Sequence, residues 1–269
     1  MSDNLDNSRG LESIRDVFAT TAAQDRAAFL PYFPVGYPDF ETSLDMIEAM
    51  AEAGVDGFEI GIPFSDPLAD GPTIQAATTR ALRTGTTVAR CFEGVAQLRH
   101  RGVEGPMLLM GYLNPLLSYG PQRFAADARE AGADGIIVPD LPPEERDILE
   151  KACGENDLAL PTFLTPNTGR HRIKILCDRA TGFIYVVSVT GVTGARDSLE
   201  MGLPGFLERA REFTEKPLVV GFGIATPRQA RQVGAMADGL IVGSALVDAA
   251  ARGVGAVRDL ASRLRRALD

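Results

Sequence analysis

The feature that most constrains the fold of this 269-residue chain is a regular alternation of short apolar segments and segments of helical length. Short apolar runs bounded by turn-forming residues are typical of buried strands, and intervening helices favour a parallel sheet covered on both faces. We predict eight strands, at Phe29–Val35, Asp56–Ile62, Pro106–Tyr112, Asp134–Val138, Leu158–Leu164, Phe183–Ser188, Pro217–Gly221 and Asp238–Gly243. Predicted helices between them include Phe40–Ala53, Val88–Arg101, Arg123–Ala131, Glu144–Cys153, Gly205–Glu215 and Pro227–Gly234.

An internal repeat supports this alternation. The segments Ala53–Gly57, Ala131–Gly135 and Ala235–Gly239 each join a helix end to Asp-Gly and then to an apolar strand. The first two copies start 78 residues apart and the last two start 104 residues apart. If the copies mark strands two, four and eight, the strand–helix units average 26 residues in the second interval and 39 in the first. The difference predicts extra chain after strand two.

These observations predict an α/β fold, a (β/α)8 TIM barrel with an extra N-terminal helix and an extended loop after strand two. Leu11, Ile14, Val17 and Phe18 have the spacing of that N-terminal helix. We expect residues 1–10 to form a flexible tail and residues 11–269 a single barrel domain, because no linker-like run divides them. A doubly wound open sheet is the alternative, but it needs a Gly-rich first turn that this sequence lacks.

The composition excludes several classes of function. The chain carries 27 Lys and Arg against 36 Asp and Glu, a net charge of −9, so a nucleic-acid or membrane partner is not expected. Two His residues cannot supply a His-rich metal site, and we expect no metal. Three scattered Cys residues without a CxxC motif indicate reduced thiols, and the absence of a signal or membrane span indicates a cytoplasmic protein.

Catalytic residues of such barrels lie at the carboxyl ends of the strands. Strand two ends with Glu59 inside an apolar run, where a carboxylate is unusual unless it is paired or functional. Burial would raise its pKa into the range of acid–base catalysis, so we favour catalysis over a structural ion pair. The following loop, residues 63–72, carries Asp66 and Asp70 among three prolines, and Asp70 is either a turn residue or a second site residue.

The last two strands end in small residues, in segments 220–224 and 241–245. Small residues let backbone N–H groups approach a phosphate, and the loops after strands seven and eight are the usual phosphate site of this fold. The segment after strand six, residues 188–197, contains two glycines and is either a mobile lid or an ordinary connector.

A Schiff-base mechanism needs a lysine at a strand end. Lys151 and Lys174 lie in predicted helices and Lys216 precedes strand seven, so none qualifies. The dinucleotide-binding motif GxGxxG is also absent. Carboxylate acid–base chemistry on a phosphorylated substrate, without a metal or a covalent intermediate, is the remaining interpretation.

The 17-residue segment Glu59–Gln75 resembles the signature of the tryptophan synthase alpha chain family. Three further segments agree in the same order, namely Met110–Pro115, Gly191–Gly194 and Gly221–Ile224. The resemblance extends from residue 11 essentially to the end of the chain. It implies a carbon–carbon lyase of L-tryptophan biosynthesis that cleaves indole-3-glycerol phosphate to indole and D-glyceraldehyde 3-phosphate.

The resemblance also implies roles for individual residues. Glu59 would protonate indole C3 and relay a proton from the glycerol hydroxyl, Asp70 would accept a hydrogen bond from the indole N–H, and Tyr185 would lie beside the substrate as the third catalytic residue. The implied phosphate-binding residues are Gly194, Gly223, Gly243 and Ser244, and the implied indole pocket is Phe222, Thr193, Tyr112 and Tyr32. Val189 and Thr190 stand where some members of the family carry Arg, so the lid contacts of those members are not assigned to this chain.

A partner is implied in the same way. The family pairs this chain with a beta chain that uses pyridoxal phosphate, in an αββα heterotetramer, so that this chain itself holds no cofactor. We expect the docking surface at the carboxyl end of the barrel, where the sequence predicts an exposed apolar patch with an acidic residue, made of Pro63, Phe64, Asp66, Pro67, Leu68 and Pro142. Two alternatives remain: another phosphate-binding TIM-barrel isomerase, and a non-catalytic regulatory barrel subunit.

Overall fold

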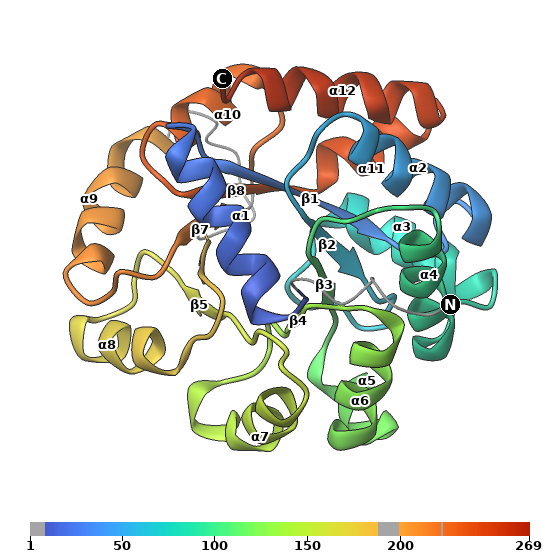
Figure 1. The fold of residues 1–269 in the computed structure, drawn as a ribbon, viewed down its shortest axis with the longest axis horizontal. Helices are drawn as coiled ribbons and strands as arrows, with labels where there is room; N and C mark the ends of the chain where they lie inside the picture. Colours follow the sequence, from blue (N-terminus) through green and yellow to red (C-terminus); the bar gives the residue numbers. More distant parts are fainter. Residues whose placement is uncertain (1–8, 188–198, 222) are drawn as a thin grey trace, which may run out of the picture.

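The computed structural model describes residues 9–187, 199–221 and 223–269. Eight parallel strands form one sheet in the order β4-β3-β2-β1-β8-β7-β6-β5, surrounded by helices (Figure 1). An isolated parallel bridge between Gly135 and Ala159 joins β4 to the segment before β5, which closes the sheet into a barrel. The predicted TIM barrel is confirmed. The strands are β1 (Ala28–Pro34), β2 (Phe58–Gly61), β3 (Met107–Met110), β4 (Gly135–Ile137), β5 (Thr162–Leu164), β6 (Ile184–Val187), β7 (Leu218–Gly221) and β8 (Gly239–Val242).

All eight predicted strands overlap observed ones, and the largest difference is in the fifth. The sequence predicts that the fifth strand begins at Leu158, but β5 begins at Thr162. Pro161 directly precedes it and has no N–H to donate to a neighbouring strand, which delays the start of regular pairing.

The helices explain the long first interval of the Asp-Gly repeat. Two helices follow β2 and two follow β3, in addition to the extended loop 62–71. The unit from the start of β2 to the start of β3 spans 107 − 58 = 49 residues, and the next unit, to the start of β4, spans only 135 − 107 = 28. The extra chain therefore follows strand two, as the spacing of the repeat predicted. The helices are α1 (Leu11–Ala23), α2 (Phe40–Glu52), α3 (Pro72–Arg83), α4 (Val88–His100), α5 (Leu113–Tyr119), α6 (Pro121–Ala131), the 3-10 helix η1 (Pro143–Glu145), α7 (Asp147–Glu155), α8 (Arg170–Arg179), α9 (Leu199–Arg211), α10 (Pro227–Gly234), α11 (Ser244–Ala250) and α12 (Val254–Arg266).

The predicted N-terminal helix is α1, and it lies across the barrel in the view of Figure 1. Its residues Ile14 and Phe18, one turn apart, are buried, and the ring of Phe18 lies 6.0 Å from that of Phe183, which directly precedes β6. Because Phe183 stands at the amino end of its strand, α1 covers the amino-terminal end of the barrel and leaves the carboxyl end to the loops that carry the site. None of the helices in the described ranges is long and apolar enough to cross a membrane.

The three repeated aspartates hold neighbouring strands together at the amino-terminal end of the barrel. Each accepts a backbone N–H from the strand next to its own, at Phe29 for Asp56, Met107 for Asp134 and Leu218 for Asp238. Each is also paired with an arginine, at Arg26, Arg99 and Arg211 respectively. The repeat therefore marks three Asp–Arg clamps, which join β1 to β2, β3 to β4 and β7 to β8.

Candidate active site

A cavity of about 180 Å³ opens at the carboxyl ends of the strands. It brings together the predicted catalytic residues Glu59, Asp70 and Tyr185 with residues predicted for the indole pocket and the phosphate site. The complete lining is Tyr32, Glu59, Asp70, Ile74, Met110, Tyr185, Gly223, Ile224, Ala225, Ile241, Gly243, Ser244 and Ala245.

Glu59 is buried inside the barrel with only 2% of its surface exposed. On β2 it is the direct register partner of Tyr32 on β1, and from across the barrel the hydroxyl of Tyr185 donates to its Oε2 at 3.4 Å. No cation pairs with Glu59 in the part of the chain that the structure describes, which argues against the structural ion pair. Burial, with a smaller contribution from the charge of Asp70, raises the pKa of Glu59 to about 8.

Asp70 is held by the loop after β2. Its backbone N–H donates to the carbonyl of Pro67 at 3.1 Å, and its own carbonyl accepts from Nε2 of Gln75 at 2.8 Å. Burial raises the pKa of Asp70 to about 6, while a hydrogen bond from Tyr112 opposes this increase. Near neutral pH the cavity therefore contains one protonated carboxyl, at Glu59, and one carboxylate, at Asp70.

Two strand-end glycines make room for the tyrosines of the site. A Cβ at Gly61 would lie 2.4 Å from the hydroxyl oxygen of Tyr32, and one at Gly221 would lie 2.4 Å from the ring of Tyr185. Burial raises the pKa of both phenols well above the usual value, so both remain proton donors. The ring of Phe163 stacks on Tyr185 at 4.6 Å and fixes it against the barrel wall.

Tyr112 lies beside the site and supports Asp70. It is buried and does not line the cavity, in contrast to its predicted place in the indole pocket. Its hydroxyl accepts the backbone N–H of Ala69 at 3.0 Å, and its ring lies 5.4 Å from that of Phe64. Tyr112 thereby connects the end of β3 to the loop that carries Asp70.

The predicted phosphate residues Gly223, Gly243 and Ser244 all line the cavity. Gly223 has a φ of 80°, a conformation that favours glycine over other residues. A Cβ at Gly243 would lie 3.2 Å from the ring of Tyr32, so the space next to this glycine is occupied by that ring. The neighbouring helix α10 begins with a capping box between Thr226 and Gln229. Gly194, Thr193 and Phe222, with the predicted lid, fall in 188–198 and 222, outside the described residues.

The apolar lining was not predicted from the sequence. Ile74, Met110 and Ile241 are buried side chains that form walls of the cavity. Met110 and Ile241 lie at or next to the carboxyl ends of β3 and β8, so the strand-end rule contained the necessary signal. Ile74 belongs to α3, a helix that the sequence analysis did not place.

The predicted docking patch is only partly exposed. Leu68 is 92% exposed and Asp66 is exposed, but Pro63 is buried and Phe64 is half-buried because it packs on Tyr112. Pro67 and Pro142 are half-buried. The exposed apolar surface of this loop is therefore concentrated at Leu68, and the expectation that Pro63 is exposed is wrong.

Comparison with known proteins identifies the family of this chain. The family model of the tryptophan synthase alpha chain matches residues 18–267. A tryptophan synthase alpha chain from Roseiflexus castenholzii is 51% identical over 238 residues, 88% of this chain and 91% of the relative, and one from Deinococcus radiodurans is 42% identical over 96% of each chain. Among solved structures, tryptophan synthase from M. tuberculosis superposes with a TM-score of 0.89 at 34% identity, covering 97% of this chain and 99% of that one. The alpha subunit from Legionella pneumophila gives a TM-score of 0.87 at 35% identity, covering 96% and 98%. This chain belongs to the tryptophan synthase alpha chain family.

Proposed function

We propose that this chain is a lyase that cleaves indole-3-glycerol phosphate to indole and D-glyceraldehyde 3-phosphate, with Glu59 and Asp70 as its acid–base pair. The observation that carries the proposal is the presence of two carboxyl groups with different pKa values in one largely apolar cavity, with small-residue loops at its other end. Environments that separate the pKa values of two carboxyls are the usual way in which one site supplies both an acid and a base.

Glu59 supplies the proton. With a pKa of about 8 it is protonated near neutral pH and can transfer its proton to indole C3. The carboxylate left behind then accepts the proton of the glycerol hydroxyl that is bonded to the carbon next to C3. As that O–H bond breaks, a C=O bond forms, the bond between this carbon and C3 breaks, and its electron pair returns to the indole ring.

Asp70 stabilises the charge that protonation creates. Protonated indole is cationic at the ring N–H, and an ionised carboxylate that accepts this N–H lowers the energy of the cation. Tyr112 and the turn from Pro67 hold Asp70 before the substrate binds, so little reorganisation is needed in the reaction. Gly223, Gly243 and Ser244 would bind the phosphate through backbone N–H groups and a hydroxyl.

An assay of the purified chain with indole-3-glycerol phosphate tests the proposal directly. Formation of indole and glyceraldehyde 3-phosphate in equal amounts is the expected result. If neither product forms, alone or with a beta chain, the lyase function is wrong. The alternatives, a sugar-phosphate isomerase or a silent regulatory barrel, are not favoured, because the site keeps both carboxyls and the family comparison points to the lyase.

The two pKa values predict a bell-shaped dependence of kcat on pH. Because Asp70 acts as a carboxylate with a pKa of about 6, activity should fall as the pH decreases through that value. Because Glu59 acts first as an acid with a pKa of about 8, activity should also fall as the pH increases through that value. Initial rates from about pH 5 to about pH 9 measure both limbs. A rate that keeps increasing above pH 8 would contradict a protonated Glu59.

A beta chain that contains pyridoxal phosphate is the proposed partner, in an αββα heterotetramer that would receive indole directly from this site. The proposed location is the cytoplasm. Support for the docking position comes from Leu68, which is exposed on the same loop that carries Asp70. Contact with a partner there would add to the contacts that already hold the loop and Asp70, which gives the beta chain a route to accelerate the lyase reaction.

Replacing Leu68 with aspartate should abolish acceleration by the beta chain and leave the basal rate unchanged. A charge introduced into a desolvated apolar contact is costly, while Leu68 itself does not line the cavity. Indole formation measured across a beta-chain titration, with sedimentation of the complex, tests this expectation. The control is Met236→Asp, a change at another exposed apolar residue that precedes β8 at the opposite end of the barrel. Full acceleration of the Leu68→Asp variant would place the docking surface elsewhere.

A further inference from the structure

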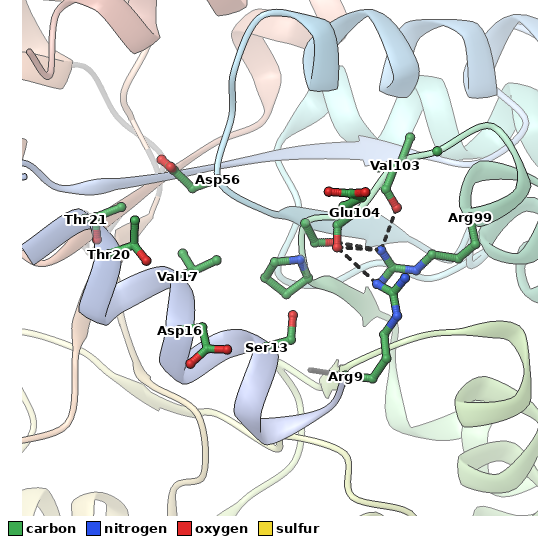
Figure 2. Close-up of a pocket in the computed structure, with 13 residues that line it drawn as sticks. Arg9, Ser13, Asp16, Val17, Thr20, Thr21, Asp56, Arg99, Val103 and Glu104 are labelled. Atoms are coloured by element: carbon green, nitrogen blue, oxygen red, sulfur yellow. Dashed lines mark hydrogen bonds between the residues drawn. The ribbon is translucent and has the colours of Figure 1, made fainter. Parts of the chain in front are cut away.

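A second cavity lies at the amino-terminal end of the barrel, opposite the active site (Figure 2). Its volume of about 450 Å³ exceeds that of the active-site cavity. One wall is the inner face of α1, and the other is built from the segments that precede β2 and β3. Its lining comprises Arg9, Ser13, Asp16, Val17, Thr20, Thr21, Asp56, Arg99, Gly102, Val103, Glu104, Gly105 and Pro106.

One side of this cavity is cationic. The guanidinium groups of Arg9 and Arg99 lie next to each other and both donate to the carbonyl oxygen of Glu104, at 3.0 and 3.1 Å (Figure 2). Arg99 is also paired with Asp134, whereas Arg9 forms no ion pair in the described ranges. Burial, with a smaller contribution from the neighbouring charge of Arg9, lowers the pKa of Arg99 to about 10, while Asp134 opposes this decrease. An anion placed between the two guanidiniums would relieve this repulsion.

The hydroxyl of Ser13 points into the cavity from the first turn of α1 (Figure 2). Ser13 is only 6% exposed, and no hydrogen-bond partner for its hydroxyl is found among the residues that the structure describes. The hydroxyl opens onto the cavity beside the cationic pair, where a ligand oxygen can bind it. The amino end of the 13-residue helix α1 adds positive potential on the same side.

The other side of the cavity is acidic. Asp16 lies one turn after Ser13 on the same face of α1, and in Figure 2 the two arginines lie on the opposite side of Ser13 from it. Within the described ranges Asp16 forms no ion pair. The carboxylate of Asp56 is occupied by Arg26 and the N–H of Phe29, whereas Glu104, like Asp16, forms no ion pair within the described ranges, so Asp16 and Glu104 supply the available negative charge. Val17, Val103 and Pro106 contribute apolar atoms to the lining of the same cavity.

We propose that this cavity binds a small zwitterion of the α-amino acid class, with its carboxylate on Arg9 and Ser13 and its ammonium on Asp16. Guanidinium groups are suited to carboxylates, and Asp16 matches a cationic group at the other end. A phosphate dianion is disfavoured because Asp16 and Glu104 face the same space and would repel it. The site goes beyond the proposed lyase function, since it lies at the opposite end of the barrel.

Isothermal titration of the full chain with glycine, L-serine, L-leucine and L-phenylalanine tests the proposal. We expect at least one of them to bind with a Kd in the millimolar range or tighter. Arg9→Ala, Ser13→Ala and Asp16→Asn should each weaken that binding by about tenfold or more. The matched controls are Arg15→Ala and Glu12→Gln, which change the same charges on the same helix at exposed residues that do not line the cavity. Both controls should bind like the unaltered chain.

Acetate, ethylamine and inorganic phosphate serve as partial ligands. Binding of phosphate or acetate as tight as that of the amino acid would contradict a zwitterion site. Absence of binding by all four amino acids, or equal losses in the cavity variants and the controls, would also overturn the proposal. Thermal unfolding confirms that the variants are folded, and their rate of indole formation should equal that of the unaltered chain. This second readout separates the proposal from the lyase function, because a chain without lyase activity can still bind the amino acid.

Discussion

Replacement of Glu59 by glutamine should lower the turnover of indole-3-glycerol phosphate by about 10²- to 10⁴-fold, the usual range for a lost acid–base group. Glutamine has nearly the same shape and can still accept the hydrogen bond from Tyr185, but it can neither donate the proton to indole C3 nor accept the hydroxyl proton. Steady-state kinetics of the variant gives kcat and KM separately, and we expect the loss in kcat.

Binding distinguishes this role from a structural one. Glycerol 3-phosphate, which lacks the indole ring, should bind the Glu59→Gln variant as it binds the unaltered chain, because the phosphate residues are unchanged. Between about pH 4.5 and pH 8 the folded chain keeps the Glu59 proton that the unfolded chain releases, so the unaltered chain should lose stability as the pH rises through this range and the glutamine variant should not. Near-normal turnover would move the catalytic acid to another residue, with Asp66 the next candidate.

Replacement of Gly243 by aspartate should abolish detectable phosphate binding. A carboxylate about 5 Å from a phosphate charge costs roughly 3 kcal/mol per unit charge at an effective dielectric constant of about 20. This corresponds to a loss of more than about 100-fold in affinity for glycerol 3-phosphate. Titration calorimetry with glycerol 3-phosphate measures the loss, and substrate KM should increase in parallel.

The matched control for this change is Gly243→Ala. Alanine introduces the same Cβ at 3.2 Å from the Tyr32 ring but no charge, so it isolates the steric effect from the electrostatic one. We expect the alanine variant to lose much less affinity than the aspartate variant. Equal losses would assign the effect to displacement of Tyr32, and unchanged affinity in both variants would show that the phosphate binds elsewhere.

The strands and the buried carboxyl group of the active site could be predicted because each is marked by a short stretch of the sequence. A charged residue inside an apolar strand, as at Glu59, stands out in the sequence alone, and the strand-end rule then gives its place in the barrel. The start of β5 was mispredicted because the apolar sequence continues through Pro161, whereas strand pairing cannot, since proline has no N–H to donate. Helix α3 was missed because the proline-rich loop before it concealed where the helix begins, and α5 was missed because Pro115 lies in its first turn.

Features that depend on tertiary contacts could not be predicted. The sequence repeat marked Asp56, Asp134 and Asp238, but their hydrogen bonds to neighbouring strands exist only after the barrel is assembled. The burial of Pro63 and the supporting position of Tyr112 likewise depend on the way in which the loop after β2 folds back over β3. The cavity beneath α1 combines residues from three separate segments, none of which carries a motif.

The unequal joining of the strands has a consequence for local unfolding. Three pairs of neighbouring strands are clamped by aspartate, whereas in the described chain β4 and β5 are joined through the single bridge between Gly135 and Ala159. On the side of the barrel that runs through β3 and β4, this seam lies between β2, which carries Glu59, and β6, which carries Tyr185, whereas β2 remains joined to β8 through β1. The weakest junction should open first, and amide hydrogen exchange at Ile136 and Ala159 should therefore be faster than at the clamped strands. Each such opening would loosen the closure that places Tyr185 opposite Glu59, so the lifetime of this seam limits how long the hydrogen bond between these two side chains persists.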